Sequence, residues 1–187
     1  MLLVIGILLW SALHLSVALT PGLRQSLIAR LGLGPYKGLF AIGIVASLVI
    51  IVLGWKAFPG GVVYVPPAGM RHLTMLLMPI AVVLFISARL PNDLTRRIRH
   101  PQLSGVKLWA LAHLLANGET RSVVLFTGLL AWAVMEVIAI NHRDGARQLP
   151  APRGALRSLL VVGVGLALTA ALMFAHPWLA GVALLPG

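Results

Sequence analysis

The sequence of 187 residues contains no cysteine and only four acidic residues, and charged residues make up only 10% of it. The missing cysteines exclude disulfides, Cys-ligated zinc or iron–sulfur sites and thiol nucleophiles. The four carboxylates, Asp93, Glu119, Glu136 and Asp144, form no pair at helical spacing, so we expect no carboxylate dyad and no di-metal centre. Any metal must therefore be held by histidine, methionine, a carboxylate or a prosthetic group.

Hydrophobic residues, by contrast, make up 59% of the chain, and its mean hydropathy is +0.98. This composition is far from that of a soluble domain and is typical of an integral membrane protein. The formal net charge of +11 would in a soluble protein suggest nucleic acid as a partner. Here the basic residues lie in short links between apolar segments, so we interpret them as topology signals and expect membrane lipid, not nucleic acid, around the protein.

Five apolar segments are long enough to cross a membrane as helices, which takes roughly 20 residues. They are residues 2–19, 37–57, 72–90, 121–140 and 156–176. Residues 102–117 form a sixth, shorter candidate that would start at Pro101 and stop at Asn117. The predicted fold class is all-α: a polytopic transmembrane bundle of about six helices in a single domain 1–187. A linker at 141–155 is expected before a last helix at 156–180.

The lysine and arginine residues orient this bundle. With the N-terminus outside, twelve of the 15 basic residues lie on the inner side and three, Lys56, Arg71 and Arg121, on the outer side. This asymmetry predicts that both termini lie on the outer, periplasmic side of a bacterial inner membrane. No positive charge precedes the first apolar segment, and Trp10, Ser11 and His14 interrupt it, so we expect a retained helix and not a cleaved signal.

Two of the six histidines, His14 and His113, fall well inside predicted spans. An unsatisfied polar group in hydrocarbon costs several kcal/mol, which makes ionisable residues at this depth functional candidates. Their surroundings match, because LWSALHL at 9–15 and LWALAHL at 108–114 place a tryptophan, Trp10 or Trp109, one turn before each histidine. Small residues on the same faces, among them Gly105, are expected to leave room for a flat macrocycle.

Spacing alone leaves two explanations open for this pair. The imidazoles can hold a haem, because imidazole is the usual protein ligand of haem iron and no thiolate is present. The absence of a CxxCH motif excludes covalent, c-type attachment. Alternatively, the two side chains form interhelical hydrogen bonds, which are common in membrane bundles.

Among the carboxylates, Glu136 could face the bundle, but we expect it to meet Lys107 or an inner arginine at the membrane surface.

Several stretches of the sequence resemble a known family, the NnrU-like proteins. They are PYKGLF at 35–40, YVPP at 64–67, RHLTMLLMP at 71–79 and RHPQLSGVKLWALAHLLANGE at 99–119. The resemblance covers residues 1 to about 140. The family includes the plant and cyanobacterial zeta-carotene isomerase, a branch that binds a b-type haem through two histidines. For this chain the resemblance implies haem b with His14 and His113 as axial ligands of the iron, and with His72 or His100 as possible substitutes.

Other residues are expected around such a haem. Trp10 and Trp109 can pack along the edge of the macrocycle, and the candidate partners of the propionates are Arg71, His72 and Lys107. These assignments follow from position along the predicted helices and from the resemblance.

The resemblance implies more than one function. The name-giving bacterial members are associated with nitrite and nitric oxide reduction, so the first expectation is a redox or accessory factor of that reductase system, linked to denitrification. The second is a haem-dependent cis-trans isomerase that binds a carotenoid in its apolar interior. In that reaction ferrous iron lends an electron to the polyene, a double bond rotates, and the electron returns without net redox change. A third expectation is a structural membrane subunit without haem.

The charge asymmetry predicts the location of the C-terminus. A reporter that is active only in the periplasm should be active when fused after Gly187 and inactive when fused within the 141–155 linker. Fractionated cells assayed for the reporter would measure both. Activity from the linker fusion with silence from the C-terminal fusion would reverse the predicted orientation.

Overall fold

A computed structural model describes residues 1–184, which contain eight helices. The helices are α1 (Leu2–Leu19), α2 (Pro21–Leu31), α3 (Leu33–Lys56), α4 (Met70–Ser87), α5 (Leu94–Arg97), α6 (Pro101–Ala116), α7 (Thr120–Asp144) and α8 (Ala155–Ala180). Five of them, α1, α3, α4, α7 and α8, are long and apolar enough to cross a membrane. Residues 1–184 form no strand, so the prediction of an all-α, multi-pass membrane protein is confirmed.

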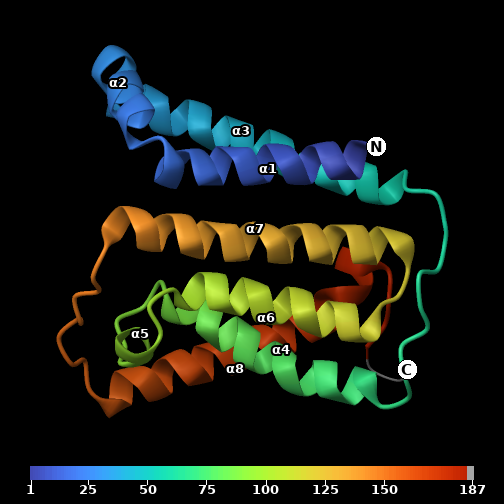
Figure 1. The fold of residues 1–187 in the computed structure, drawn as a ribbon. Coiled ribbons are helices and arrows are strands. Elements are labelled where there is room, and N and C mark those ends of the chain that lie inside the picture. The colour runs from blue at the N-terminus through green and yellow to red at the C-terminus, as the bar shows by residue number, and fades with distance from the viewer. Residues whose placement is uncertain (185–187) are drawn as a thin grey trace.

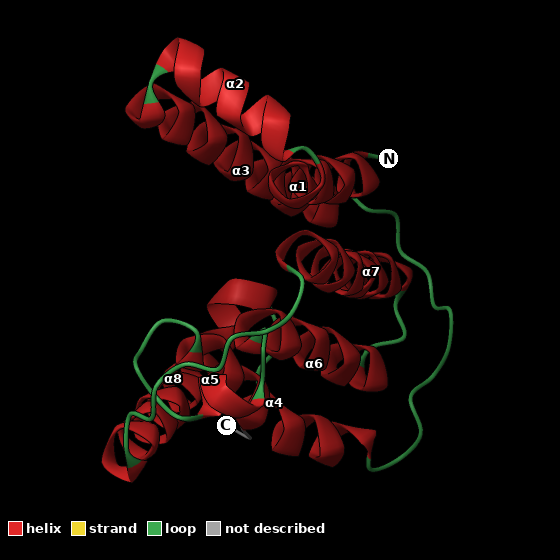
Figure 2. Cartoon of the chain, turned by 60° about the vertical axis from the view of Figure 1, so that its left-hand side comes forward, coloured by secondary structure: helices red, strands yellow, loops and turns green. Residues whose placement is uncertain are grey.

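The helices pack in a row (Figure 1). α1 packs against α3 on one side and α7 on the other, α7 packs against α6, α6 against α4, and α4 against α8. Figure 2 shows that α7 lies between the α1–α2–α3 layer and the group formed by α4, α6 and α8. The first three helices, α1, α2 and α3, therefore contact the remaining helices mainly through the packing of α1 against α7.

Helix α6 is the short helix that the sequence predicts. It has 16 residues, starts with Pro101 at its first position and is followed by Asn117 as its C-cap. At a rise of about 1.5 Å per residue it is roughly 24 Å long, less than the ~30 Å of a bilayer core. Its end is held by the loop before α4, because the single O–H of Tyr64 is shared between the carbonyl oxygens of Leu114 and Asn117.

Helix α2 is a feature that hydropathy did not predict. It begins with Pro21 immediately after the end of α1, contains no buried residue and packs beside α3. The Arg24 guanidinium lies 5.9 Å from the centre of the Tyr36 ring, within the range of a cation–π contact. Its residues are mostly exposed and mixed in polarity, so α2 contains no apolar run from which hydropathy could predict a helix. A proline after a threonine was the available sequence signal for its start.

Gly105 brings α6 against the backbone of α4. A Cβ atom at this position would lie 2.6 Å from the Ala81 carbonyl oxygen and 2.9 Å from the Phe85 nitrogen. Ala110 and Ala112 of the same helix are fully buried. These small residues of α6 thus allow close packing against α4, a use of small residues that is common between membrane helices.

We expect Gly105→Ala to destabilise the fold by about 1–3 kcal/mol, because the added methyl group must displace backbone atoms of α4. Gly163→Ala in α8 is a matched control, since a Cβ there meets nothing within 4 Å. Thermal unfolding of the two variants in the same detergent would measure the difference. A Gly105→Ala protein as stable as the control would show that α4 and α6 are not in close contact.

Candidate functional site

A cleft of about 1420 Å³ lies between α7 and the α4–α6 pair. It extends from side chains of α1 and α3 to the loops that precede α6 and follow α7. Its walls are largely apolar, with Leu103, Val106, Leu125 and Leu129 among the lining residues. Small-molecule sites usually measure about 300–1,000 Å³, so this cleft is large enough for a bulky ligand.

His14 lies on the α1 side of the cleft and is half-buried. Its Nδ1 hydrogen-bonds the Trp10 carbonyl oxygen at 2.9 Å. A carbonyl oxygen can only accept, so Nδ1 carries the hydrogen, and the Nε2 lone pair of the neutral ring is left available. The ring packs against Trp10 at a centroid distance of 4.2 Å and against Trp132 of α7 at 5.1 Å. These contacts fix the orientation of an imidazole that can ligate a metal.

His113 repeats this local geometry on α6. Its Nδ1 donates a hydrogen bond to the Trp109 carbonyl oxygen at 2.9 Å, which likewise leaves Nε2 as the acceptor. The ring stacks on Phe126 of α7 with centroids 4.5 Å apart. Unlike His14, however, His113 is not among the residues that line the cleft.

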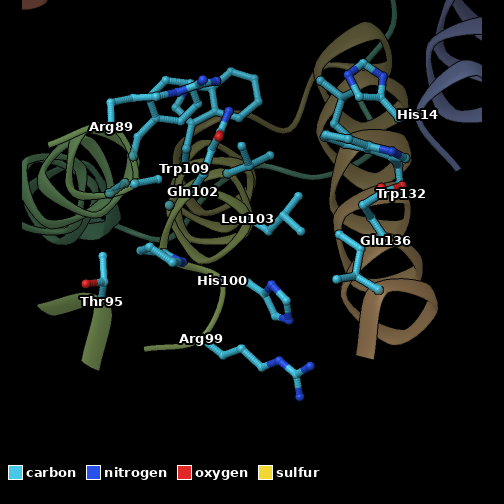
Figure 3. A pocket seen from close by; sticks show the side chains of 18 of the residues that line it. His14, Arg89, Thr95, Arg99, His100, Gln102, Leu103, Trp109, Trp132 and Glu136 are labelled. Carbon is cyan, nitrogen blue, oxygen red and sulfur yellow. The ribbon is translucent and has the colours of Figure 1, made fainter. Parts of the chain in front are cut away.

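His100 reaches the same cleft as His14, from the loop before α6 (Figure 3). Its Nε2 donates to the Asn141 amide oxygen at 2.8 Å, so Nδ1 of the neutral ring keeps its lone pair. Three arginines, Arg89, Arg99 and Arg147, line this end of the cleft. We call them the basic mouth. Neither ion pair found within residues 1–184 involves these arginines.

Glu136 lines the cleft one turn after Trp132 on α7, and its exposed fraction is only 7%. Glu136 forms no direct ion pair with Lys107 or an inner arginine, because both ion pairs in the described chain, Arg121–Glu119 and Arg143–Asp144, lie elsewhere. Of the inner arginines, Arg143 attracts its carboxyl group from a longer distance. The Trp132 indole is close to the Glu136 carboxyl group. Nevertheless, Trp132 Nε1 and Glu136 Oε2 lack a hydrogen-bond partner of normal geometry.

The structure thus gathers only some of the predicted site residues. His14, Trp10 and Trp109 line the cleft together with His100, whereas Lys107, Arg71 and His72 do not. Arg71 lies at the opposite end of α4, where it donates a hydrogen bond to the Leu184 carbonyl oxygen at 2.8 Å. Within residues 1–184 no group of three or more His, Asp or Glu side chains is placed to hold a metal ion. Trp132, which sequence reasoning did not select, lies one turn before the lone buried carboxylate.

The loop between α4 and α6 holds the mouth of the cleft in place. Asn92 is almost fully buried, and its amide donates to the Ser87 carbonyl oxygen at 2.7 Å while its Oδ1 accepts from the backbone N–H of Leu94. The carboxylate of Asp93 accepts hydrogen bonds from the N–H groups of Arg153 and Gly154 at 2.7 and 3.0 Å. The linker 145–154 is therefore tied to this loop directly before α8.

The fold and the cleft define a multi-pass helical membrane protein with a large, mainly apolar cleft whose polar groups are concentrated around His14 and at a basic mouth. The model of one family, the NnrU protein, matches residues 2–184, and the chain therefore belongs to the NnrU family. The match continues through the linker and α8, beyond residue 140, where the resemblance in the sequence was expected to end. No curated protein and no solved structure matches the chain.

We expect Asp93→Ala to release the linker, because it removes both acceptors for the Arg153 and Gly154 amides. Charge-assisted hydrogen bonds contribute about 1.5–3 kcal/mol, so trypsin should cleave after Arg153 about tenfold faster or more. Asp144→Ala is the control, since that carboxylate pairs with the adjacent Arg143. Peptide mapping over a time course measures both rates. Equal rates in the two variants would show that Asp93 does not hold the linker.

Proposed function

We propose that the protein binds a b-type haem in the cleft, with His14 as an iron ligand, and that it acts as a redox or accessory factor in nitrite and nitric oxide reduction. The observation that carries this proposal is the His14 imidazole. Its Nδ1 is fixed to the Trp10 carbonyl oxygen, and the available Nε2 belongs to a side chain that lines the cleft. Imidazoles that ligate metals commonly donate their other ring N–H to such a carbonyl.

The other residues of the cleft fit the same group. The apolar walls suit a macrocycle, and unpaired buried polar atoms at Trp10, Trp132 and Glu136 indicate that the cleft holds something more than side chains. Arginine pairs well with carboxylates, so Arg89, Arg99 and Arg147 at the basic mouth are better placed to bind propionates than Arg71, His72 or Lys107. When bound, a haem supplies one-electron redox chemistry and an iron site for a diatomic molecule.

Two histidines are candidates for a second iron ligand. The family resemblance favours His113, which has the same hydrogen bond to a preceding tryptophan carbonyl as His14. The cleft favours His100, which lines it together with His14. Separate substitutions distinguish these two, because removing a ligand changes the spin state of the iron whereas removing a packing residue does not.

Nitrite and nitric oxide reduction is the context that the family supports for a bacterial inner-membrane protein. Deleting the gene is expected to lower nitric oxide reductase activity in membranes, and restoring the wild-type gene, but not a His14→Ala gene, should recover it. An unchanged reductase activity in the deletion strain would reject the accessory role.

Carotenoid isomerisation is the second candidate function, and the size of the cleft favours it. About 1420 Å³ with mainly apolar walls can hold the polyene segment of a carotenoid beside a haem. Purified protein that converts a cis-carotenoid to its trans isomer, as followed by chromatography, would select this function over the accessory role.

His14→Ala is expected to lose the haem or to convert its absorption spectrum from low spin to high spin. Of the two second-ligand candidates, His113→Ala and His100→Ala, the true ligand should produce the same change. His142→Ala is a suitable control, since His142 does not line the cleft. The measurement is the Soret band of oxidised and reduced protein purified from haem-replete cells. An unaltered band in His14→Ala would reject the proposed ligand.

A further inference from the structure

Three buried polar atoms in the described part of the chain have no hydrogen-bond partner: Trp10 Nε1, Trp132 Nε1 and Glu136 Oε2. Trp132 and Glu136 are 5% and 7% exposed, so water reaches neither side chain freely. A buried donor or acceptor that stays unpaired is costly, and in native proteins such atoms are uncommon. The Trp132 indole is close to the Glu136 carboxyl group without a hydrogen bond of normal geometry between Nε1 and Oε2, and all three residues line one cleft.

The three groups form a single cluster on the α1–α7 wall. The Trp10 and Trp132 rings meet edge to face with centroids 5.5 Å apart. Glu136 follows Trp132 by one turn, and Figure 3 shows both side chains on the same wall as His14. These three side chains are therefore neighbours on one wall of the cleft, and we call them the indole–carboxyl cluster (Trp10, Trp132 and Glu136).

The chemistry of this cluster restricts the ligand that can occupy it. An indole N–H only donates, so the ligand must bring acceptors for Trp10 and Trp132. The carboxyl group of Glu136 accepts from a hydroxyl when ionised and donates to a carbonyl when protonated. A pure hydrocarbon would leave all three groups unpaired. The apolar walls beyond the cluster, at Leu125 and Leu129 among others, require the rest of the ligand to be apolar.

We propose that the indole–carboxyl cluster binds the headgroup of a lipophilic quinone or quinol. A carbonyl oxygen of a quinone ring has two lone pairs and can accept from both neighbouring indole N–H groups, and in the reduced form a hydroxyl donates to Glu136. Its alkyl tail fits the apolar walls. The cleft, at about 1420 Å³, exceeds the usual volume of a site for one small molecule and leaves space for a quinone headgroup beside a second ligand.

This inference goes beyond the proposed haem function, although the unpaired atoms of Trp10, Trp132 and Glu136 also support the presence of a ligand there. It concerns the indole and carboxyl groups, whereas haem binding concerns the nitrogen ligands of the iron. The two are therefore scored by different readouts on the same purified samples.

The test measures binding of decylubiquinone to the full-length protein in phosphatidylcholine nanodiscs by calorimetry, with empty nanodiscs subtracted. Decylbenzene, which has the same tail and no carbonyl groups, is the matched ligand. The wild type should bind decylubiquinone at least tenfold more tightly than decylbenzene. Trp132→Phe, which keeps the ring and removes the N–H, should weaken decylubiquinone binding about tenfold and leave decylbenzene unchanged.

Three further variants complete the design. Trp178→Phe is the control, because Trp178 is 84% exposed and lies outside the cleft, and it should bind both ligands as the wild type does. Glu136→Gln, which keeps a hydrogen-bonding group, should retain decylubiquinone binding, whereas Glu136→Leu should lose it. Equal affinity of the wild type for the two ligands, or unchanged decylubiquinone binding in Trp132→Phe, would overturn the inference. The Soret band of the same samples reports haem, so loss of haem binding with quinone binding intact would reject only the proposed function.

Discussion

The hydrocarbon core of a membrane supplies no hydrogen-bond partners, so each polar side chain of a spanning helix must find one within the protein. In this bundle most of them find it on their own helix. Ser11, Ser47, Ser87 and Thr169 are buried, and each donates to a backbone carbonyl three or four residues earlier. His14 and His113 follow the same pattern with their ring nitrogens. The three unpaired polar atoms on residues that line the cleft depart from this pattern.

The position of α7 explains why the cleft forms where it does. α7 contacts α1 on one side and α6 on the other, so its side chains must fill the space between two groups of helices that pack well within themselves. On the α6 side, Gly105 and buried alanines let α6 and α4 approach closely. The large aromatic side chains at the α7 contacts, Phe126 and Trp132, pack against histidines of α6 and α1. Tight packing of α4 with α6 thus coexists with an open region along α7.

Much of the fold could be predicted from the sequence, because hydropathy, proline and charge report local properties. Apolar length located the five spans, and Pro101 with Asn117 located the short α6. Helix α2 was missed because its mixed polarity gives no apolar run, and its packing depends on α3. The role of Gly105 could not be predicted either. From the sequence, a glycine two turns before a histidine indicates only free space on that face, and its contact with the backbone of α4 becomes known once α4 is placed.

Glu136 shows the same limit for the candidate site. Near the end of a basic-flanked span, a carboxylate is expected to find an arginine, and the sequence offers several. Whether it does depends on the direction in which its face of α7 points. That face carries Trp132 one turn earlier and lines the cleft, so the carboxyl group is buried among apolar walls and one indole. Periodicity can place Trp132 and Glu136 on one face, but only the neighbouring helices decide that this face is a binding wall.

The two matching segments LWSALHL and LWALAHL extend this argument. Both fold into a helix in which the histidine Nδ1 hydrogen-bonds the tryptophan carbonyl oxygen at 2.9 Å, so the local sequence determines the same tautomer twice. Their surroundings differ, because Phe126 stacks on His113 whereas Trp132 meets the His14 ring at a steep angle, at the edge of the cleft. The stacked His113 ring keeps the lone pair of its Nε2, but Phe126 restricts the directions from which another group can reach that nitrogen. Local sequence therefore determines the hydrogen bond and the tautomer of both imidazoles, while long-range packing determines that only His14 of the two lines the cleft.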